Sequence, residues 1–351
     1  MSSKAIGWDP GTMFFQLAEK NGKDIDINII RNAFVEMDAT EDIEQALAQN
    51  NWQYISDGKK YYIIGEDSLK VAKMFPGKIE LRRPMQDGVL NKGEDKKMLV
   101  MTKILEDVIG QAPDENSMVC FCVSSDSVDN NVDNTFHKAR LEGMAKRLGY
   151  NTKVIDEGYA VVLAERPIYI ELDGTESPYS GIGISFGAGK VNCVMAYKGV
   201  PIVSMSATRS GDYIDQKVAE QTGTPIAKVT SIKEKKLDFD NIDYDDDVIF
   251  ALDAYYENMI KYVFMNFAKE FAKNESDFEA PLDIVLAGGT SMPPGFRGKV
   301  QSIVNKLDLP FEVKEVKHAS DPRNAVVKGC LTQAIISQKK FQDKSVDRML
   351  E

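Results

Sequence analysis

Strand-like runs of apolar residues, separated by short glycine turns, occur in the same order in both halves of the chain. These runs cover residues 5–8, 13–19 and 26–35 in the first half and residues 181–197 and 201–207 in the second half. Glycine and its neighbours interrupt each run after a few residues, which is typical of β-hairpins. Each half is therefore expected to begin with a hairpin that is followed by a third strand.

Beyond these strands, the apolar residues in both halves follow the spacing of helices that alternate with single buried strands. In the first half the predicted elements are a helix at 96–109, a strand at 118–123, a helix at 132–148, a strand at 152–155 and a helix at 159–164. In the second half they are helices at 212–221 and 248–273, a strand at 282–287, a helix at 295–307, a strand at 311–316 and a helix at 324–338. Hairpins followed by βα units, twice over, predict an α/β fold of two duplicated lobes.

A chain of 351 residues is long for a single core, so two lobes are expected. The first lobe is placed at residues 1–160, with a small insert at about 36–80, and the second at residues 161–338, with an insert at about 224–247. Residues 339–351 follow the last predicted helix, and we expect them to form a frayed tail.

Charge and hydropathy narrow the classes of function. The net charge is −11, and much of the acidic excess lies in residues 238–247, which are expected to form a solvated loop. An acidic surface argues against nonspecific binding to nucleic acid. No signal peptide is evident, and no apolar stretch is long enough to span a bilayer, so a cytoplasmic protein is expected.

The cysteines and histidines do not indicate a metal site or a nucleophile. Cys120 and Cys122 share one strand-like run and have no second close pair, so we expect reduced, buried thiols rather than zinc ligands. His137 and His318 have no plausible nucleophile near them in the sequence, and both are interpreted as structural or surface residues.

A short glycine phrase marks the first turn of both hairpins. The first copy is Gly7-Trp8-Asp9-Pro10-Gly11-Thr12, and the second is Gly183-Ile184-Ser185-Phe186-Gly187-Ala188-Gly189-Lys190. Glycine lets the backbone approach a ligand closely, and clustered N–H groups attract anions. Two such turns facing each other predict a clamp for the phosphates of a nucleotide.

Five stretches together resemble the actin superfamily, which also includes sugar kinases and the seventy-kilodalton heat-shock chaperones. They are the two glycine phrases and residues 83–90, 154–160 and 284–295. The last stretch is the most specific, since a plain strand–helix turn would not need its whole string around Gly288-Gly289-Thr290. Within the superfamily, the sequence is most similar to the bacterial actins of MreB and MamK type. The resemblance implies an actin-like fold, with two duplicated ribonuclease-H-like lobes and a nucleotide cleft between them.

The resemblance also implies roles for the residues that match the family's motifs. It implies that Asp9 holds Mg²⁺ and that Glu157 positions an attacking water. The phosphates of ATP are expected at Gly11, Thr12, Met13, Gly187, Ala188, Gly189 and Lys190, and the nucleoside at Gly211, Asp212, Lys233, Glu234, Gly288, Gly289, Thr290 and Met292.

The residues by themselves leave plainer interpretations open. Asp9 lies in an Asp-Pro-Gly sequence that is also a good turn, and Glu157 lies where a helix dipole favours an acid. Lys233 and Glu234 fit a common surface-helix pattern, and Asp212 fits a helix N-cap.

The chain departs from the family pattern at three positions. Gly158 replaces the proline that usually follows the glutamate, Ser185 replaces an aspartate, and Lys190 replaces a threonine. Because the aspartate would face the metal, its loss leads us to expect slow ATP hydrolysis. Lys190 is expected either to lie near phosphate or to point to solvent.

The leading interpretation is an ATP-binding, bacterial actin-like protein that polymerises into filaments. The polymerisation rests on the resemblance alone. The implied partner is the chain itself, and a cargo adaptor is left open. The alternative is a soluble small-molecule kinase or phosphatase of the same superfamily. A chaperone or a membrane-bound scaffold is not favoured, because neither a large domain after residue 338 nor an N-terminal amphipathic anchor is found.

Overall fold

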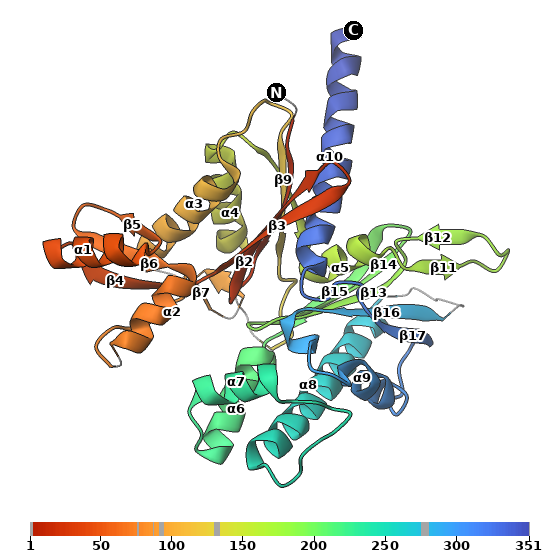
Figure 1. Cartoon of the computed structure of the whole chain (residues 1–351). Coiled ribbons are helices and arrows are strands. Elements are labelled where there is room, and N and C mark those ends of the chain that lie inside the picture. The colour runs from red at the N-terminus through yellow and green to blue at the C-terminus, as the bar shows by residue number, and fades with distance from the viewer. Residues whose placement is uncertain are drawn as a thin grey trace.

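Two five-stranded sheets with helices on both faces form the body of the molecule, as a computed structural model shows (Figure 1). The structure describes residues 3–75, 77–86, 88–90, 95–129, 134–274 and 281–350. Asp87 of the 83–90 stretch, and the first residues of the helix expected at 132–148, lie outside the described residues.

The two sheets have matching strand orders, β10-β9-β1-β2-β3 and β15-β14-β13-β16-β17. The first contains β1 (Ala5–Pro10), β2 (Phe14–Asn21), β3 (Asp24–Arg31), β9 (Met118–Val123) and β10 (Asn151–Asp156). The second contains β13 (Gly181–Phe186), β14 (Val191–Tyr197), β15 (Val200–Ala207), β16 (Leu282–Ala287) and β17 (Val313–His318). In each sheet the hairpin is antiparallel, and the two later strands run parallel to its first strand. The predicted duplication is therefore confirmed.

The larger helices cover both faces of each sheet. They are α3 (Asp95–Ile109), α4 (Thr135–Arg147), α5 (Glu157–Glu165), α6 (Gly211–Thr222), α7 (Ile226–Lys235), α8 (Asp247–Ala272), α9 (Phe296–Val304) and α10 (Ala325–Leu350). In the second sheet, Ile184 packs into a core with residues of α8 and α9, whereas Val194 and Val285 face a core shared with α5 and α10. Burial on both faces explains why β13 and β16 are buried throughout their length.

Helices α5 and α10 are exchanged between the two sheets. α5 follows β10 of the first sheet but packs against β13 and β14 of the second, and α10 follows β17 but packs against β1 and β9. Glycines permit this close approach: a Cβ on Gly7 would overlap the backbone of α10 at Leu331, and one on Gly183 would overlap α5 at Gly158. Where the two helices cross, Gly329 contacts the carbonyl of Ala160 in the same way.

Smaller elements extend from this body. β4 (Phe34–Asp38), β5 (Tyr54–Ser56), β6 (Lys60–Ile64), α1 (Glu41–Asn50) and α2 (Gly65–Met74) form a separate layer, and the remaining elements are β7 (Met85–Gln86), β8 (Val89–Leu90), β11 (Ile168–Ile170), β12 (Glu176–Pro178) and the 3₁₀ helix η1 (Gly289–Ser291). In the acidic run, Asp246 caps α8 by accepting hydrogen bonds from Val248 N (2.9 Å) and Ile249 N (3.2 Å).

The structure corrects the expectation of a frayed tail at residues 339–351. α10 continues as a helix to Leu350, well beyond the predicted end at Gln338. No proline or glycine interrupts residues 330–351, and lysine, glutamine and leucine are good helix formers, so nothing in this sequence ends the helix. Within the described residues, no helix is both long enough and apolar enough to cross a bilayer.

We expect Gly329→Ala to destabilise the protein by about 1–3 kcal/mol or more, because its new methyl group would overlap the backbone of α5. Gly298→Ala in α9 is the matched control, since a Cβ there meets nothing within 4 Å and alanine favours helix. Urea denaturation measures both changes. Equal stability of the two variants would contradict the proposed role of the helix crossing.

Candidate functional site

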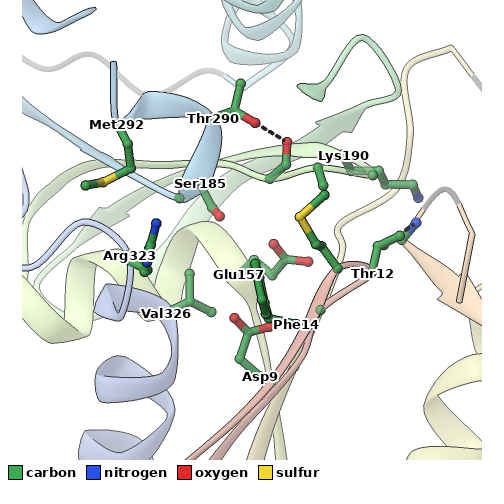
Figure 2. Close-up of a pocket in the computed structure, with 18 of the residues that line it drawn as sticks. Asp9, Thr12, Phe14, Glu157, Ser185, Lys190, Thr290, Met292, Arg323 and Val326 are labelled. Carbon is green, nitrogen blue, oxygen red and sulfur yellow. Dashed lines mark hydrogen bonds between the residues drawn. The ribbon is translucent and has the colours of Figure 1, made fainter. Parts of the chain in front are cut away.

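A cleft lies where the glycine turns of the two sheets face each other (Figure 2). It is lined by Asp9, Pro10, Gly11, Thr12, Met13, Phe14, Gln16, Met85, Gly88, Glu157, Ser185, Gly187, Ala188, Gly189, Lys190, Lys233, Glu234, Tyr256, Gly288, Gly289, Thr290, Met292, Pro293, Pro294, Arg323 and Val326. Of the residues expected from the sequence, all but Gly211 and Asp212 line this cleft.

The first glycine turn joins β1 to β2 and is held by neighbouring side chains. Asn32 Nδ2 donates a hydrogen bond to the carbonyl oxygen of Gly11 (2.9 Å), which fixes the turn from the side of β3. Thr12 Oγ1 accepts a hydrogen bond from Gly88 N (3.2 Å), which ties the turn to the β7–β8 hairpin. The turn is therefore held in place before any ligand arrives.

The second glycine turn is held by the segments that follow it. Gly187 N donates to Lys190 O (2.9 Å), and Thr290 Oγ1 donates to Gly187 O (2.9 Å). Gly211 N and Asp212 N, at the start of α6, donate to the carbonyl oxygens of residues 187 and 188. Gly211 and Asp212 thus lie behind the turn and support it. They were expected to contact the nucleoside, but they do not line the cleft. The N-cap position of α6 is occupied by Ser210, so the interpretation of Asp212 as N-cap is also wrong.

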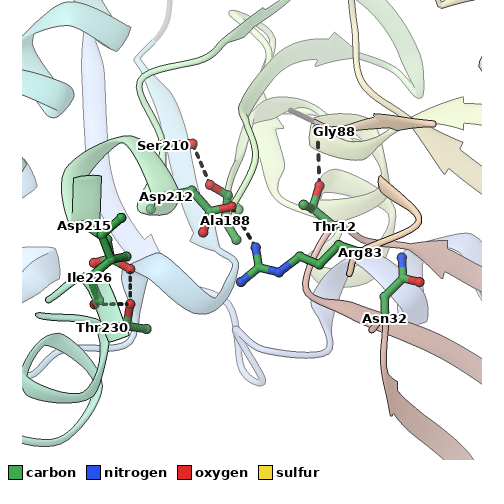
Figure 3. Close-up of polar contacts among 12 residues, drawn as sticks. Thr12, Asn32, Arg83, Gly88, Ala188, Ser210, Asp212, Asp215, Ile226 and Thr230 are labelled. Carbon is green, nitrogen blue, oxygen red and sulfur yellow. Dashed lines mark hydrogen bonds and ion pairs between the residues drawn. The ribbon is translucent and has the colours of Figure 1, made fainter. Parts of the chain in front are cut away.

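The two turns approach each other closely across the cleft. A Cβ on Gly189 would lie 2.6 Å from Thr12 Oγ1 and 2.8 Å from Gly88 N. Nearby, Arg83 Nη1 lies 3.1 Å from Asp212 Oδ2, an ion pair that joins the segment before β7 to α6 (Figure 3). The cleft is therefore closed on this side by contacts between the two halves of the chain.

Two half-buried carboxylates, Asp9 and Glu157, lie close together in the cleft (Figure 2). Burial raises the pKa of Asp9 to about 6, and Cys122 Sγ donates a weak hydrogen bond to Asp9 Oδ1 (3.5 Å). Burial, and then the nearby charge of Asp9, raise the pKa of Glu157 to about 8. Ser124 Oγ donates to Glu157 Oε1 (3.3 Å). Glu157 therefore releases its proton less readily than an exposed glutamate does.

Two of the residues that depart from the family pattern are buried near these carboxylates. Ser185 is buried at the end of β13, and its hydroxyl lowers the pKa of Glu157 by hydrogen bonding, in opposition to burial. Lys190 is also buried, so the interpretation that it points to solvent is wrong. Its charge lowers the pKa of Glu157 and, after burial, that of His137.

The far end of the cleft is formed by the segment after β16 and by α7. Gly288 has φ +94°, which favours glycine, and its N–H donates to Pro322 O (2.8 Å). Lys233 lines this end, but its Nζ already lies 2.8 Å from Asp215 Oδ1 and 3.0 Å from Gly211 O. The Lys233 stem therefore faces the cleft, while its charge is neutralised behind it.

Sequence reasoning missed several residues of the cleft, including Tyr256, Phe14 and Arg323. Tyr256 lies in the middle of α8, where its hydroxyl donates to Thr290 O (3.1 Å), and no motif marks it. Arg323 lies in the segment between β17 and α10, for which no role in the cleft was predicted. His137 and all four cysteines are buried, and the cysteines are free thiols; His318 is partly buried and stacks on Phe296.

The raised pKa of Glu157 leads to a prediction about how stability depends on pH. Because the pKa of Glu157 is about 8 in the folded state and about 4.5 when unperturbed, only the unfolded chain releases this proton between those pH values. Raising the pH from 4.5 to 8 should therefore lower the free energy of unfolding of the nucleotide-free protein. Asp9 should add a similar loss below pH 6.

We expect Glu157→Gln to flatten the fall in melting temperature between pH 6 and 8, because glutamine has no proton to release. Glu115→Gln, which changes an exposed glutamate, is the matched control and should leave the profile unchanged. Parallel profiles of wild type and Glu157→Gln would contradict the raised pKa of this carboxylate.

Comparisons with known proteins place the fold. The solved structure of the MamK double helical filament superposes with a TM-score of 0.66 at 18% identity, over 95% of this chain and 99% of that one. MreB5 of Spiroplasma citri bound to ADP gives a TM-score of 0.66 at 14% identity, over 97% and 99%. These identities show the fold alone, and that fold is the actin-like fold predicted from the sequence.

Sequence relatives point the same way. The actin-like protein MamK of Magnetospirillum gryphiswaldense is 24% identical over 161 residues, which is 45% of this chain and 39% of MamK. MamK of Paramagnetospirillum magneticum is 24% identical over the same length, 45% of this chain and 41% of MamK. The chain thus matches about two fifths of the length of these curated relatives. A model of the volactin family matches residues 4–334, and this actin-like protein therefore belongs to the volactin family.

Proposed function

We propose that this protein binds ATP with Mg²⁺ in the cleft and polymerises into filaments in the cytoplasm. The observation that carries the proposal is the meeting of two glycine turns from two duplicated sheets beside a pair of half-buried carboxylates. Solved relatives of the same fold support it: MreB5 of Spiroplasma citri is bound to ADP in one structure and to AMPPNP in another, and MamK forms a double helical filament.

The turns are suited to phosphate because backbone, rather than side chains, faces the space between them. Side chains on Gly11 and Gly187 would overlap the carbonyls of Phe14 and Lys190, so only glycine permits turns this tight. Tight turns expose neighbouring N–H groups, which attract anions. Phosphate would lie between residues 11–13 and 187–189, and the buried Lys190 would add positive charge beside it.

Asp9 fits a magnesium ion that accompanies the nucleotide. Its half-buried carboxylate lines the cleft, and a cation there would offset the desolvation that now raises its pKa. Mg²⁺ prefers carboxylate and water oxygens together with substrate phosphates, and it neutralises the charge of the phosphates that it contacts.

Glu157 is the residue that we assign to orienting water at the terminal phosphate. It begins α5 and shares the cleft floor with Asp9, and Ser124 holds one of its carboxylate oxygens. Ser185 lies where the family carries a second carboxylate, and its hydroxyl brings no charge to the metal. We therefore expect this site to hydrolyse ATP slowly.

Nucleotide state would act on assembly through the cleft. The ligand would contact both glycine turns, and each turn belongs to a different sheet, so bound phosphate would favour the closed arrangement. Closure would change the relative orientation of surfaces that meet the next copy in a filament. A cargo adaptor could bind the assembled surface, as the resemblance to MreB and MamK allows.

We expect the purified protein to pellet with Mg-ATP and to stay in the supernatant without nucleotide. Asp9→Ala should weaken Mg-ATP binding at least about tenfold, since a hydrogen bond or contact to a charged group contributes about 1.5–3 kcal/mol. Asp24→Ala, which removes an exposed carboxylate of β3, is the matched control. ATP binding without any assembly, together with turnover of a small-molecule acceptor, would instead support a soluble kinase or phosphatase.

Ser185→Asp should raise ATP hydrolysis at least about tenfold, because it restores a charged oxygen ligand near the phosphates. Glu157→Ala should leave ATP affinity unchanged and slow hydrolysis by about 100-fold, the range typical of a lost water-activating group. Phosphate release under single-turnover conditions measures both. An unchanged rate in either variant would remove that residue from the proposed mechanism.

A further inference from the structure

The hairpin of β11 and β12 projects from the second sheet and is rigidly attached on one face (Figure 1). On that face Tyr169 is buried, and its ring packs edge-to-face on Tyr197 with centroids 5.5 Å apart. Glu171 Oε1 accepts hydrogen bonds from Ser177 Oγ (2.6 Å) and Tyr197 Oη (2.6 Å), and it pairs with Lys198 Nζ (2.8 Å). These contacts fix the direction in which the opposite face points.

The opposite face of the hairpin is apolar and exposed. Ile168 and Ile170 alternate along β11, so their side chains share one face, and Leu172 follows in the turn; the exposed fractions of the three are 41%, 43% and 84%. Two exposed acids, Asp173 and Glu176, lie beside them. A row of large apolar side chains on a projecting hairpin is costly to leave in water, and such a surface is typical of a protein–protein contact.

A second exposed surface with the complementary chemistry lies at the other end of the same sheet. β13 starts at Gly181, next to the hairpin, and ends at the cleft, where α6 begins against the second glycine turn and leads into α7. α7 exposes Lys228 and Lys235, which lie seven residues apart on one helix face, whereas the exposed Ile226 of its first turn lies on the opposite side of the helix. Figure 1 shows the hairpin and α7 on opposite sides of the molecule.

We propose that the apolar face of the β11–β12 hairpin docks on α7 of a second copy of this chain, with Asp173 and Glu176 facing Lys228 and Lys235. The acids beside the apolar face of the hairpin and the lysines on the exposed face of α7 are complementary in charge. Because they are different surfaces, their contact is heterologous and repeats without closing, which generates a filament. This inference rests on the proposed function, since it names the contact through which copies would assemble.

The first test is Ile170→Asp, which places a charge in the centre of the apolar face. We expect it to raise the protein concentration needed for pelleting with Mg-ATP at least about tenfold, the effect of losing a central interface residue. Ile25→Asp in β3 is the matched control, since Ile25 has a similar exposed fraction of 42% on the other sheet. Equal pelleting of Ile170→Asp and wild type, or equal loss in both variants, would overturn the hairpin contact.

The second test uses charge reversal and does not depend on a loss of function alone. One variant carries Asp173→Lys and Glu176→Lys, and the other carries Lys228→Glu and Lys235→Glu. Each variant alone should fail to pellet, because like charges would meet at every contact. An equimolar mixture should pellet, because each hairpin then meets an α7 of opposite charge in alternating copies.

The outcomes separate the two proposals. If wild type does not pellet with nucleotide, the proposal of polymerisation is wrong, and the hairpin contact that rests on it is wrong too. If wild type pellets but the mixture of reversed variants does not, polymerisation stands and the pairing of hairpin with α7 is wrong. Restored pelleting of the mixture supports both, and it also shows that each variant is folded.

Discussion

The exchange of α5 and α10 between the two sheets is the constraint on which the rest of the structure depends. Each helix leaves one sheet and packs against the other, and their backbones touch at Gly329 and Ala160. Gly7 and Gly183 are needed at matching places in β1 and β13, because a side chain there would hold each helix away from its sheet. The crossing sets how the two sheets face each other, so it also sets the distance between the glycine turns. Relative rotation of the two halves would have to occur about this crossing.

In the ligand-free protein the cleft disfavours the charged forms of two carboxyl groups, which a bound cation would stabilise. Asp9 and Glu157 lie close together and half-buried, and desolvation raises both pKa values before any partner charge is present. Contacts between the two halves of the chain, such as the ion pair of Arg83 and Asp212, nevertheless hold the cleft closed on one side. A bound cation and phosphates would relieve the unfavourable burial, which links ligand binding to the stability of the closed arrangement.

Much of the fold and of the cleft could be predicted from the sequence, because the informative patterns are local. The duplicated hairpins, the buried strand at 282–287 and the glycine turns all follow from residues adjacent in the chain. What the sequence did not show depends on contacts between distant segments: Asp215 neutralises Lys233, Arg83 pairs with Asp212, and Tyr256 reaches the cleft from α8. The β11–β12 hairpin was missed because each of its strands has only three residues, too few for a clear alternation.

The most direct measurement is an experimental structure of the protein with Mg²⁺ and a non-hydrolysable ATP analogue. We expect its phosphates between residues 11–13 and 187–189, with the metal on the side of Asp9 and the nucleoside toward Gly288. A nucleotide bound elsewhere on the chain, or a cleft that stays empty at saturating analogue, would contradict the assignment of this cleft. In that case the facing glycine turns would serve only the packing of the two halves.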